Sequence, residues 1–357
     1  MRIFDPHIHM TARTTDDYRA MYDSGVRAVV EPAFWLGQPR TSVGSFTDYF
    51  DALIGWERFR AAQYGIRHHA TIGLNPKEAN DPRCREVLDV LPRYLTKDGV
   101  VAVGELGYDS LTPEEDEVFA AQLALAVTFD LPAMVHTPHR DKAAGTTRTL
   151  DVVRESGIAP ERVVVDHLTE TTVAAVADSG CWMGFSIYPD TKMDEHRMVT
   201  ILPEFGTDRV LENSAADWGN SDPLKTRKTA QAMLDAGFTD HDVDVVLWQN
   251  PVAFYGQSGR LHLDPYAESL THHANLRPAH PHDRTHHRRL PGDVRLRRPR
   301  GGGAFVLARP TPHQRGQFRG LLRRADRVGA VPCRAVRDPP PRHDRPEPER
   351  GQRPALS

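Results

Sequence analysis

Short apolar runs rich in β-branched residues alternate with amphipathic stretches over the first 256 residues, and this alternation constrains the fold most strongly. Helical patterns lie between the runs: Pro113–Phe129 follows the cap residue Thr112, and Asp222–Ala236 is closed by Gly237. Near-continuous apolar strands joined through helices indicate a parallel sheet covered on its outside. We predict eight strands, at Arg2–Phe4, Arg27–Glu31, Ile66–Gly73, Val100–Gly104, Ala133–His136, Val163–Asp166, Trp182–Ile187 and Arg209–Asn213.

Eight strand–helix units in about 250 residues match the length of a closed (β/α)8 TIM barrel of the α/β class. The rival is an open, doubly wound sheet, which would gather the chemistry near one or two crossover points. In this chain, polar residues able to do chemistry follow many different strands. We therefore expect a barrel over residues 1–262.

The remaining segment, residues 263–357, shows little periodicity. From Thr271 onward it holds 20 arginines, 13 prolines and 8 histidines, but no lysine, isoleucine or tyrosine. Either it is a basic disordered tail or it is an out-of-frame reading of GC-rich DNA, and we expect no fold in it. Before Thr271 the chain carries 25 basic and 41 acidic residues, an excess that argues against broad nucleic-acid binding by the barrel.

We expect no membrane partner. No run approaches the roughly 20 apolar residues that span a bilayer. The amino terminus has no apolar core of signal-peptide length. These features predict a cytoplasmic protein.

Candidate metal ligands follow the predicted strands. His7 and His9 are two residues apart in an extended segment, so their side chains project to the same side. Further candidates close or follow four later strands, and parallel strands present their carboxyl ends at one barrel mouth. Four histidines and two carboxylates thus converge there: His7, His9, Glu105, His136, His167 and Asp217.

The barrel region resembles TatD-type hydrolases of the amidohydrolase superfamily. The resemblance rests on the His-x-His opening and on Glu105 in Glu-Leu-Gly-Tyr-Asp. It also rests on Leu131-Pro132 before the apolar strand that ends in His136, and on Asn250 in Trp-Gln-Asn-Pro near the end of the barrel region. More narrowly, the chain is similar to the TatD-like hydrolase of bacterial Ebo gene clusters. This resemblance implies a TIM barrel with one or two divalent ions.

The resemblance also implies a role for each ligand. His7 and His9 would bind the first metal, Glu105 would bridge both, and His136 and His167 would complete the second site. Asp217 would ligate the first metal and take up a proton, so that Glu105 and Asp217 are the expected catalytic residues. The mixed donors suit zinc, manganese or iron.

The chain departs from the TatD pattern at three places. Asn75 stands where that family has His in Gly-x-His-Pro, and Arg140 lies four residues after His136 rather than two. Asp217 lies beyond Asn213 and Ser214, which leaves Glu212 as an alternative acid. In the wider superfamily, Lys142 is an alternative as a carboxylated bridging lysine.

We expect the mouth to bind substrate through Trp35, Arg67, Arg140, Tyr188 and Trp218. The expected activity is metal-dependent hydrolysis of an ester, amide or phosphoester in a small metabolite. The alternatives are a TatD-type 3'-5' exonuclease acting on DNA and a non-catalytic, metal-bearing metabolite-binding barrel. Nucleic acid would otherwise be a partner only through the arginine-rich tail.

Overall fold

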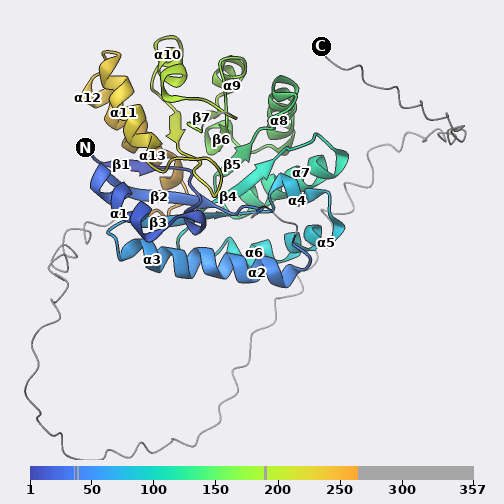
Figure 1. Cartoon of the computed structure of the whole chain (residues 1–357). Helices are drawn as coiled ribbons and strands as arrows, with labels where there is room; N and C mark the ends of the chain where they lie inside the picture. Colours follow the sequence, from blue (N-terminus) through green and yellow to red (C-terminus); the bar gives the residue numbers. More distant parts are fainter. Residues whose placement is uncertain (36, 38–39, 189–190, 264–357) are drawn as a thin grey trace, which may run out of the picture. The chain divides into compact units, whose positions relative to one another are not determined.

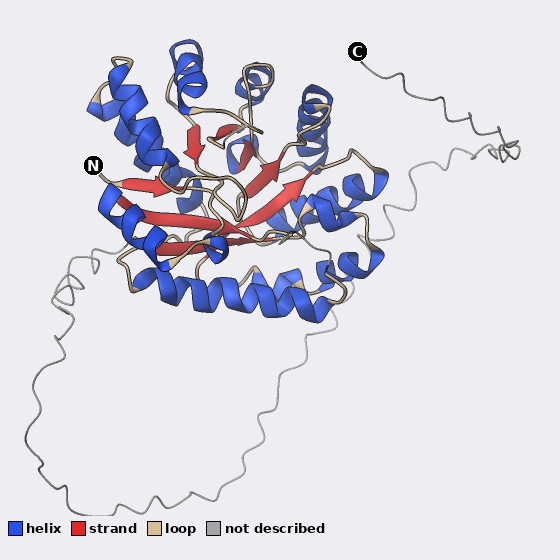
Figure 2. Cartoon of the chain, viewed as in Figure 1, coloured by secondary structure: helices blue, strands red, loops and turns tan. Residues whose placement is uncertain are grey.

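The computed structural model describes residues 1–35, 37, 40–188 and 191–263 (Figure 1). Strands and helices alternate along this part of the chain, with strands inside and helices outside (Figure 2). The strands are β1 (Ile3–Asp5), β2 (Val26–Pro32), β3 (Arg67–Ile72), β4 (Val100–Gly107), β5 (Ala133–His136), β6 (Val163–Asp166), β7 (Trp182–Ser186) and β8 (Val210–Asn213). All eight predicted strands are confirmed.

The helices are of three kinds. The α-helices are α1 (Thr15–Ser24), α2 (Val43–Asp51), α3 (Arg58–Ala62), α4 (Pro76–Ala79), α5 (Pro82–Arg85), α6 (Leu91–Tyr94), α7 (Pro113–Thr128), α8 (Lys142–Ser156), α9 (Val173–Ser179), α10 (Glu195–Phe205), α11 (Lys225–Asp235), α12 (Asp240–Asp244) and α13 (Asn250–Gly256). The 3-10 turns are η1 (Met10–Ala12), η3 (Glu86–Asp89) and η4 (Pro160–Arg162), and the π-helical turns are η2 (Ala52–Glu57) and η5 (Val245–Gln249).

The sheet runs in the order β1 to β8, and every neighbouring pair is parallel. It closes between the segments that follow β8 and β1. The amide of Ala215 donates to the carbonyl of His7 at 2.8 Å, and the amide of His9 donates to the carbonyl of Ala216 at 2.9 Å. The chain therefore forms the predicted (β/α)8 TIM barrel.

Large side chains fill the inside of the barrel, as in other barrels of this type. Phe4, Val101, Met134 and Leu211 point inward from four strands and pack with Phe254 and Tyr255 of α13. The hydroxyl of Tyr255 donates to the carbonyl of Pro6 at 2.8 Å. This packing ties α13 to the segment that carries His7.

Helix starts follow the sequence signals. The Thr112 hydroxyl accepts the amide of Glu115, and Pro113 occupies the first turn of α7. The second predicted helix begins at Lys225 rather than Asp222. The reason is that the Asp222 carboxylate accepts the amide of Leu224 at 2.9 Å and so belongs to the turn before the helix.

Two further predictions concern the carboxyl-terminal segment and membrane-spanning helices. Apart from Leu263, the predicted segment 263–357 lies outside them. Within them, no helix combines the length and apolarity needed to cross a membrane.

Candidate metal centre

The segment after β1 carries two buried histidines to the mouth of the barrel. The amide of Ile8 donates to Val30 of β2 at 3.1 Å, which fixes the segment between β2 and the loop after β8. The Nε2 atoms of His7 and His9 lie 3.2 Å apart. β1 ends at Asp5 and the chain bends at Pro6 and His7, yet the two imidazoles still meet at one point, as predicted.

Glu105 connects these histidines to those of later strands. Its Oε1 lies 2.8 Å from His136 Nδ1 and 3.1 Å from His167 Nε2. Its Oε2 accepts the side-chain amide of Asn75 at 2.9 Å. The residue that replaces the histidine of the TatD pattern therefore holds the central carboxylate.

Three groups of buried side chains could each hold an ion, with ligand atoms within 4.8 Å of one another. They are His7, His9 and Glu105; His7, Asp166 and His167; and Glu105, His136 and His167. The groups share members and so form one cluster of six residues, which we call the metal cluster. Five of the six predicted ligands belong to it, and Asp217 does not.

Asp166 is the member that sequence reasoning missed. Its Oδ2 lies 2.7 Å from His7 Nδ1, and its Oδ1 accepts the side-chain amide of Asn213 at 3.1 Å. A proton on His7 Nδ1 leaves the Nε2 lone pair pointing at His9, as a metal ligand requires. The available signal was an acid that ends the apolar strand immediately before His167.

Replacing Asp166 by Asn should weaken metal binding about 10- to 100-fold, because an outer carboxylate fixes the tautomer and orientation of a ligating histidine. Titration of metal into the purified variant measures the change. Asp23→Asn, an exposed aspartate on α1, is the matched control. Unchanged affinity in Asp166→Asn would show that His7 does not depend on this carboxylate.

The protonation states favour a cation. Burial lowers the pKa of His9 and of His167 well below the usual value, so both imidazoles are neutral at pH 7. Burial alone would raise the pKa of Glu105, but the His136 and His167 imidazoles hold it well below its ordinary range. Neutral imidazoles around an ionised carboxylate are the ligand forms that divalent metals bind.

Buried nitrogens that lack hydrogen-bond partners among the described residues also indicate a cation site. His9 Nδ1 and His136 Nε2 are buried and have no hydrogen-bond partner among the described residues. A buried nitrogen without a partner costs about 1–3 kcal/mol. Because the donor set is nitrogen and carboxylate oxygen, the cluster fits one or two divalent ions.

Glu31 of β2 holds the turn that follows His9. Its Oε1 accepts the amide and the hydroxyl of Thr11 at 2.8 and 3.0 Å, and its Oε2 lies 2.7 Å from His68 Nε2. This buried network fixes the chain immediately after a candidate ligand.

Asp217 lies beside the cluster, in the loop after β8. Its Oδ1 accepts the Tyr188 hydroxyl and the Gly219 amide, both at 2.8 Å. A Cβ on Gly219 would lie 2.3 Å from the Tyr188 hydroxyl oxygen, so this contact requires glycine there. Asp217 Oδ2 makes no hydrogen bond to the described residues.

Aromatic rings cover one side of the mouth. Phe34 stacks on the His9 ring with centroids 4.0 Å apart, and it lies 5.0 Å from Trp218. Trp35 and Trp218 lie 6.4 Å apart. Two of the predicted substrate residues, from loops after β2 and β8, therefore meet above a candidate ligand.

Lys192, in the loop after β7, was not predicted. Its Nζ lies 5.3 Å from the Tyr188 ring centroid. Burial lowers its pKa against the attraction of Glu105, Asp166 and Asp217. The position lacks periodicity or motif, so the sequence offered no signal for it.

Of the two predicted substrate arginines, Arg140 lies in the loop after β5 and Arg67 lies at the start of β3. Arg140 is exposed and makes no hydrogen bond or ion pair to the described residues. Arg67 is the first residue of β3. Because the strands are parallel and the cluster lies at their carboxyl ends, the expectation that Arg67 lines this mouth is corrected: it sits at the opposite end of the barrel.

The two alternative residues face elsewhere. Glu212 Oε1 accepts the Thr229 hydroxyl of α11 at 2.7 Å, so this side chain leaves the sheet on the side opposite to Asn213. Lys142 Nζ donates to the Thr137 hydroxyl at 3.1 Å and to the His167 carbonyl at 2.8 Å. Neither belongs to the metal cluster.

Known proteins resemble this chain in sequence and, among solved structures, in fold. An uncharacterised metal-dependent hydrolase of Methanocaldococcus jannaschii is 26% identical over 259 residues, which cover 71% of this chain and 99% of that protein. A TatD-like protein from Archaeoglobus fulgidus, 24% identical, aligns with a TM-score of 0.60 over 71% of this chain and 99% of that structure.

The Escherichia coli phosphotriesterase homology protein, solved with phosphate in its active site, is 18% identical. It aligns with a TM-score of 0.54 over 71% of this chain and 98% of that structure. The family model described as TatD related DNase matches residues 4–256. This chain therefore belongs to the TatD family and is a metal-dependent hydrolase.

Proposed function

We propose that this hydrolase cleaves an ester, amide or phosphoester bond in a small metabolite at the mouth of its barrel. The observation that carries the proposal is the metal cluster, in which Glu105 belongs to two of the three overlapping groups of ligand atoms. His7, His9, Glu105, His136 and His167 would hold one or two ions of zinc, manganese or iron. A bound divalent ion lowers the pKa of water and polarises the substrate oxygen.

Three further polar residues would take part in proton transfer and in holding charge at the site. Asp217 accepts a proton at Oδ2, because its Oδ1 is already held by Tyr188 and Gly219. Lys192, attracted to Glu105 and Asp217, provides a positive charge for a substrate oxygen. Asn75 keeps the Glu105 carboxylate in place through its side-chain amide.

The walls of the mouth favour a small substrate with a flat apolar part over DNA. Phe34, Trp35 and Trp218 offer ring faces beside His9. A cavity of about 640 Å³ adjoins Trp35, and each carboxylate of its lining is paired with a cation. The pairs are Glu78 with Arg40, Asp81 with Arg83, and Asp109 with Lys77. A polyanion needs a positively charged groove, and a lining whose cations are already paired with carboxylates does not provide one.

A substrate screen distinguishes a small-metabolite substrate from DNA. Metal-loaded protein is offered p-nitrophenyl esters, p-nitrophenyl phosphodiesters and short single-stranded DNA, with His136→Ala as the inactive control. Turnover of small esters or phosphodiesters without loss of nucleotides from DNA supports the proposal. Stepwise 3'-5' shortening of DNA would favour the exonuclease, and metal binding without turnover of any compound would favour a metabolite-binding barrel.

Replacing Trp218 by Ala should raise KM for an aromatic substrate about tenfold with little change in kcat, because ring contacts contribute about 0.5–1.5 kcal/mol each. Initial-rate kinetics on a p-nitrophenyl substrate measure the split. Trp56→Ala, another exposed tryptophan on η2, is the matched control. An equal KM in both variants would remove Trp218 from the substrate site.

Two finer statements stay predictions of the sequence. One is the kinship with hydrolases of Ebo gene clusters, and the other is the cytoplasmic location.

A further inference from the structure

A buried arginine, Arg40, lies in the loop between β2 and α2, on the aromatic side of the mouth. Its side chain is 7% exposed, and its Nη1 donates to Oε1 and Oε2 of Glu78 on α4 at 2.8 and 2.7 Å. Burying two charges removes their hydration, so an ion pair of this kind is by itself weak evidence of a gain in stability. The other contacts of Arg40 therefore indicate what this side chain does.

The same guanidinium holds the backbone of Phe34. Its Nη2 donates to the Phe34 carbonyl at 2.7 Å, and the Phe34 amide donates to the Tyr49 hydroxyl at 3.1 Å. Because β2 ends at Pro32, Phe34 lies beyond the hydrogen-bond ladder of the sheet. Two side chains therefore satisfy the backbone groups that a neighbouring strand would otherwise satisfy.

Arg40 is itself held from three helices. The rings of Phe46 and Tyr49 on α2 have their centroids 4.7 and 4.5 Å from the central guanidinium carbon. Glu78 binds the guanidinium from α4, and the Cys84 thiol of α5 donates to the Arg40 carbonyl at 3.3 Å. A planar guanidinium can bind a carboxylate and a carbonyl together in one fixed geometry, which a lysine ammonium cannot reproduce. The position of Arg40 is thus fixed by the scaffold.

The peptide group that Arg40 holds joins two rings of the mouth. On one side of it, the Phe34 ring stacks on the His9 ring with centroids 4.0 Å apart. On the other side, Trp35 lines the cavity of about 640 Å³ and lies 6.4 Å from Trp218. Among the described residues, Arg40 belongs to none of the three ligand groups of the metal cluster. Its influence on the site therefore passes through Phe34 and Trp35.

We propose that Arg40 is a positioning residue for substrate binding, which fixes the peptide group between Phe34 and Trp35 and so holds both rings at the mouth. The inference rests on the proposed function, in which these rings bind the apolar part of the substrate. Rings that are already in place before the substrate arrives lose less conformational freedom on binding. Arg40 therefore contributes to substrate affinity without touching the substrate.

Kinetics on a p-nitrophenyl substrate test this role. Arg40→Met removes the guanidinium but leaves an apolar chain between the Phe46 and Tyr49 rings. KM should rise about tenfold and kcat should stay within about twofold, because the ring contacts contribute to binding and the metal cluster is unchanged. In a Phe34→Ala/Trp35→Ala background, the same substitution should change KM by less than about twofold, since no ring remains to be positioned.

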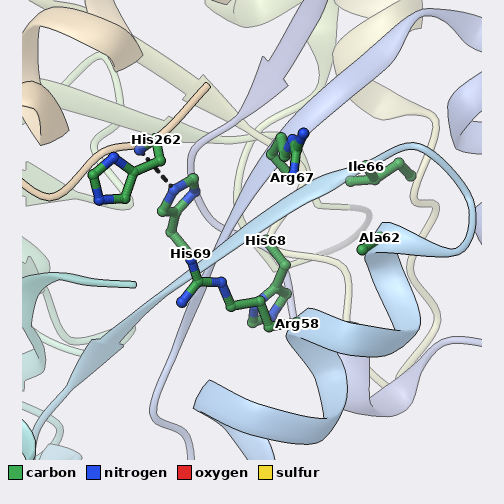
Figure 3. A pocket seen from close by; sticks show the side chains of 7 residues that line it. All are labelled: Arg58, Ala62, Ile66, Arg67, His68, His69 and His262. Atoms are coloured by element: carbon green, nitrogen blue, oxygen red, sulfur yellow. Dashed lines mark hydrogen bonds between the residues drawn. The ribbon is translucent and has the colours of Figure 1, made fainter. Parts of the chain in front are cut away.

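Arg58→Met is the matched control. Arg58 Nη1 also donates to a carboxylate, Asp98 Oδ2 at 2.8 Å, and its side chain also lines a cavity. That cavity, of about 250 Å³, adjoins Arg67 at the start of β3 rather than the mouth (Figure 3). Arg58→Met should therefore leave both KM and kcat at the values of the parent chain.

Near-UV circular dichroism gives a second measurement that needs no turnover. The difference between the parent spectrum and that of Trp35→Phe defines the signal of Trp35 in its fixed position beside Trp218. Arg40→Met should lose most of this signal, and Arg58→Met should keep it. A protein that cleaves no p-nitrophenyl compound but loses the signal in Arg40→Met would refute the proposed substrate class and leave the positioning by Arg40 supported.

Tyr49→Phe provides the same comparison if Arg40→Met does not fold. It keeps the ring beside Arg40 and removes only the hydroxyl that accepts the Phe34 amide, so KM should rise a few-fold, about the effect of one hydrogen bond. A folded Arg40→Met variant that retains the parent near-UV signal overturns the proposal. So does a parent-like KM in an active Arg40→Met variant, or an equal rise of KM in the background without the two rings.

Discussion

Replacing Glu105 by Gln should abolish most of the turnover and metal binding of this hydrolase. The substitution keeps the size of the side chain but removes the negative charge that lies against His136 and His167. Even the loss of a residue that only hydrogen-bonds to a metal ligand typically lowers metal affinity or activity about 10- to 100-fold. Loss of the central carboxylate should therefore lower both by more than about a hundredfold. Metal content of the purified variant and initial rates with added metal measure both effects.

The comparison needs a variant that keeps the fold. Glu204→Gln, an exposed glutamate on α10, should retain the metal content and rate of the parent chain. Circular dichroism shows whether Glu105→Gln remains folded, because Glu105 is buried. A folded Glu105→Gln variant that keeps full metal content and turnover would contradict the placement of the catalytic centre.

The barrel and most of the metal cluster could be predicted because each depends on a local pattern. A parallel strand in a barrel is apolar on both faces, so all eight strands stand out as short runs. Residues at strand ends share one rim, and this rule brings His7, Glu105, His136 and His167 together. The two-residue spacing of His7 and His9 predicted their common direction, although β1 itself ends at Asp5.

Other features depend on three-dimensional relations that no short stretch encodes. Arg67 was assigned to the mouth, although its place at the start of β3 puts it at the far rim. Asp166 looked like an ordinary strand residue until its contact with His7, which lies 159 positions earlier. Lys192 approaches the cluster from a loop without periodicity, so only the folded chain shows its position.

The second large effect is expected at Asp217. If this carboxylate accepts the proton, Asp217→Asn should lower kcat about 10²- to 10⁴-fold, the usual contribution of a positioned acid or base. Metal content should stay near the parent value, because Asp217 belongs to none of the three ligand groups among the described residues. This combination would separate a proton acceptor from a metal ligand.

The strongest comparison is with Asp166, because both aspartates attract the Lys192 ammonium and the same substitution applies to both. Asp166→Asn should lose metal affinity and recover turnover at high metal concentration, whereas Asp217→Asn should stay slow at every metal concentration. Asp178→Asn, an exposed residue on α9, controls for loss of a carboxylate alone. If Asp166→Asn stayed slow with metal fully bound while Asp217→Asn turned over normally, the proton would belong to Asp166, since its Oδ2 already lies 2.7 Å from His7 Nδ1.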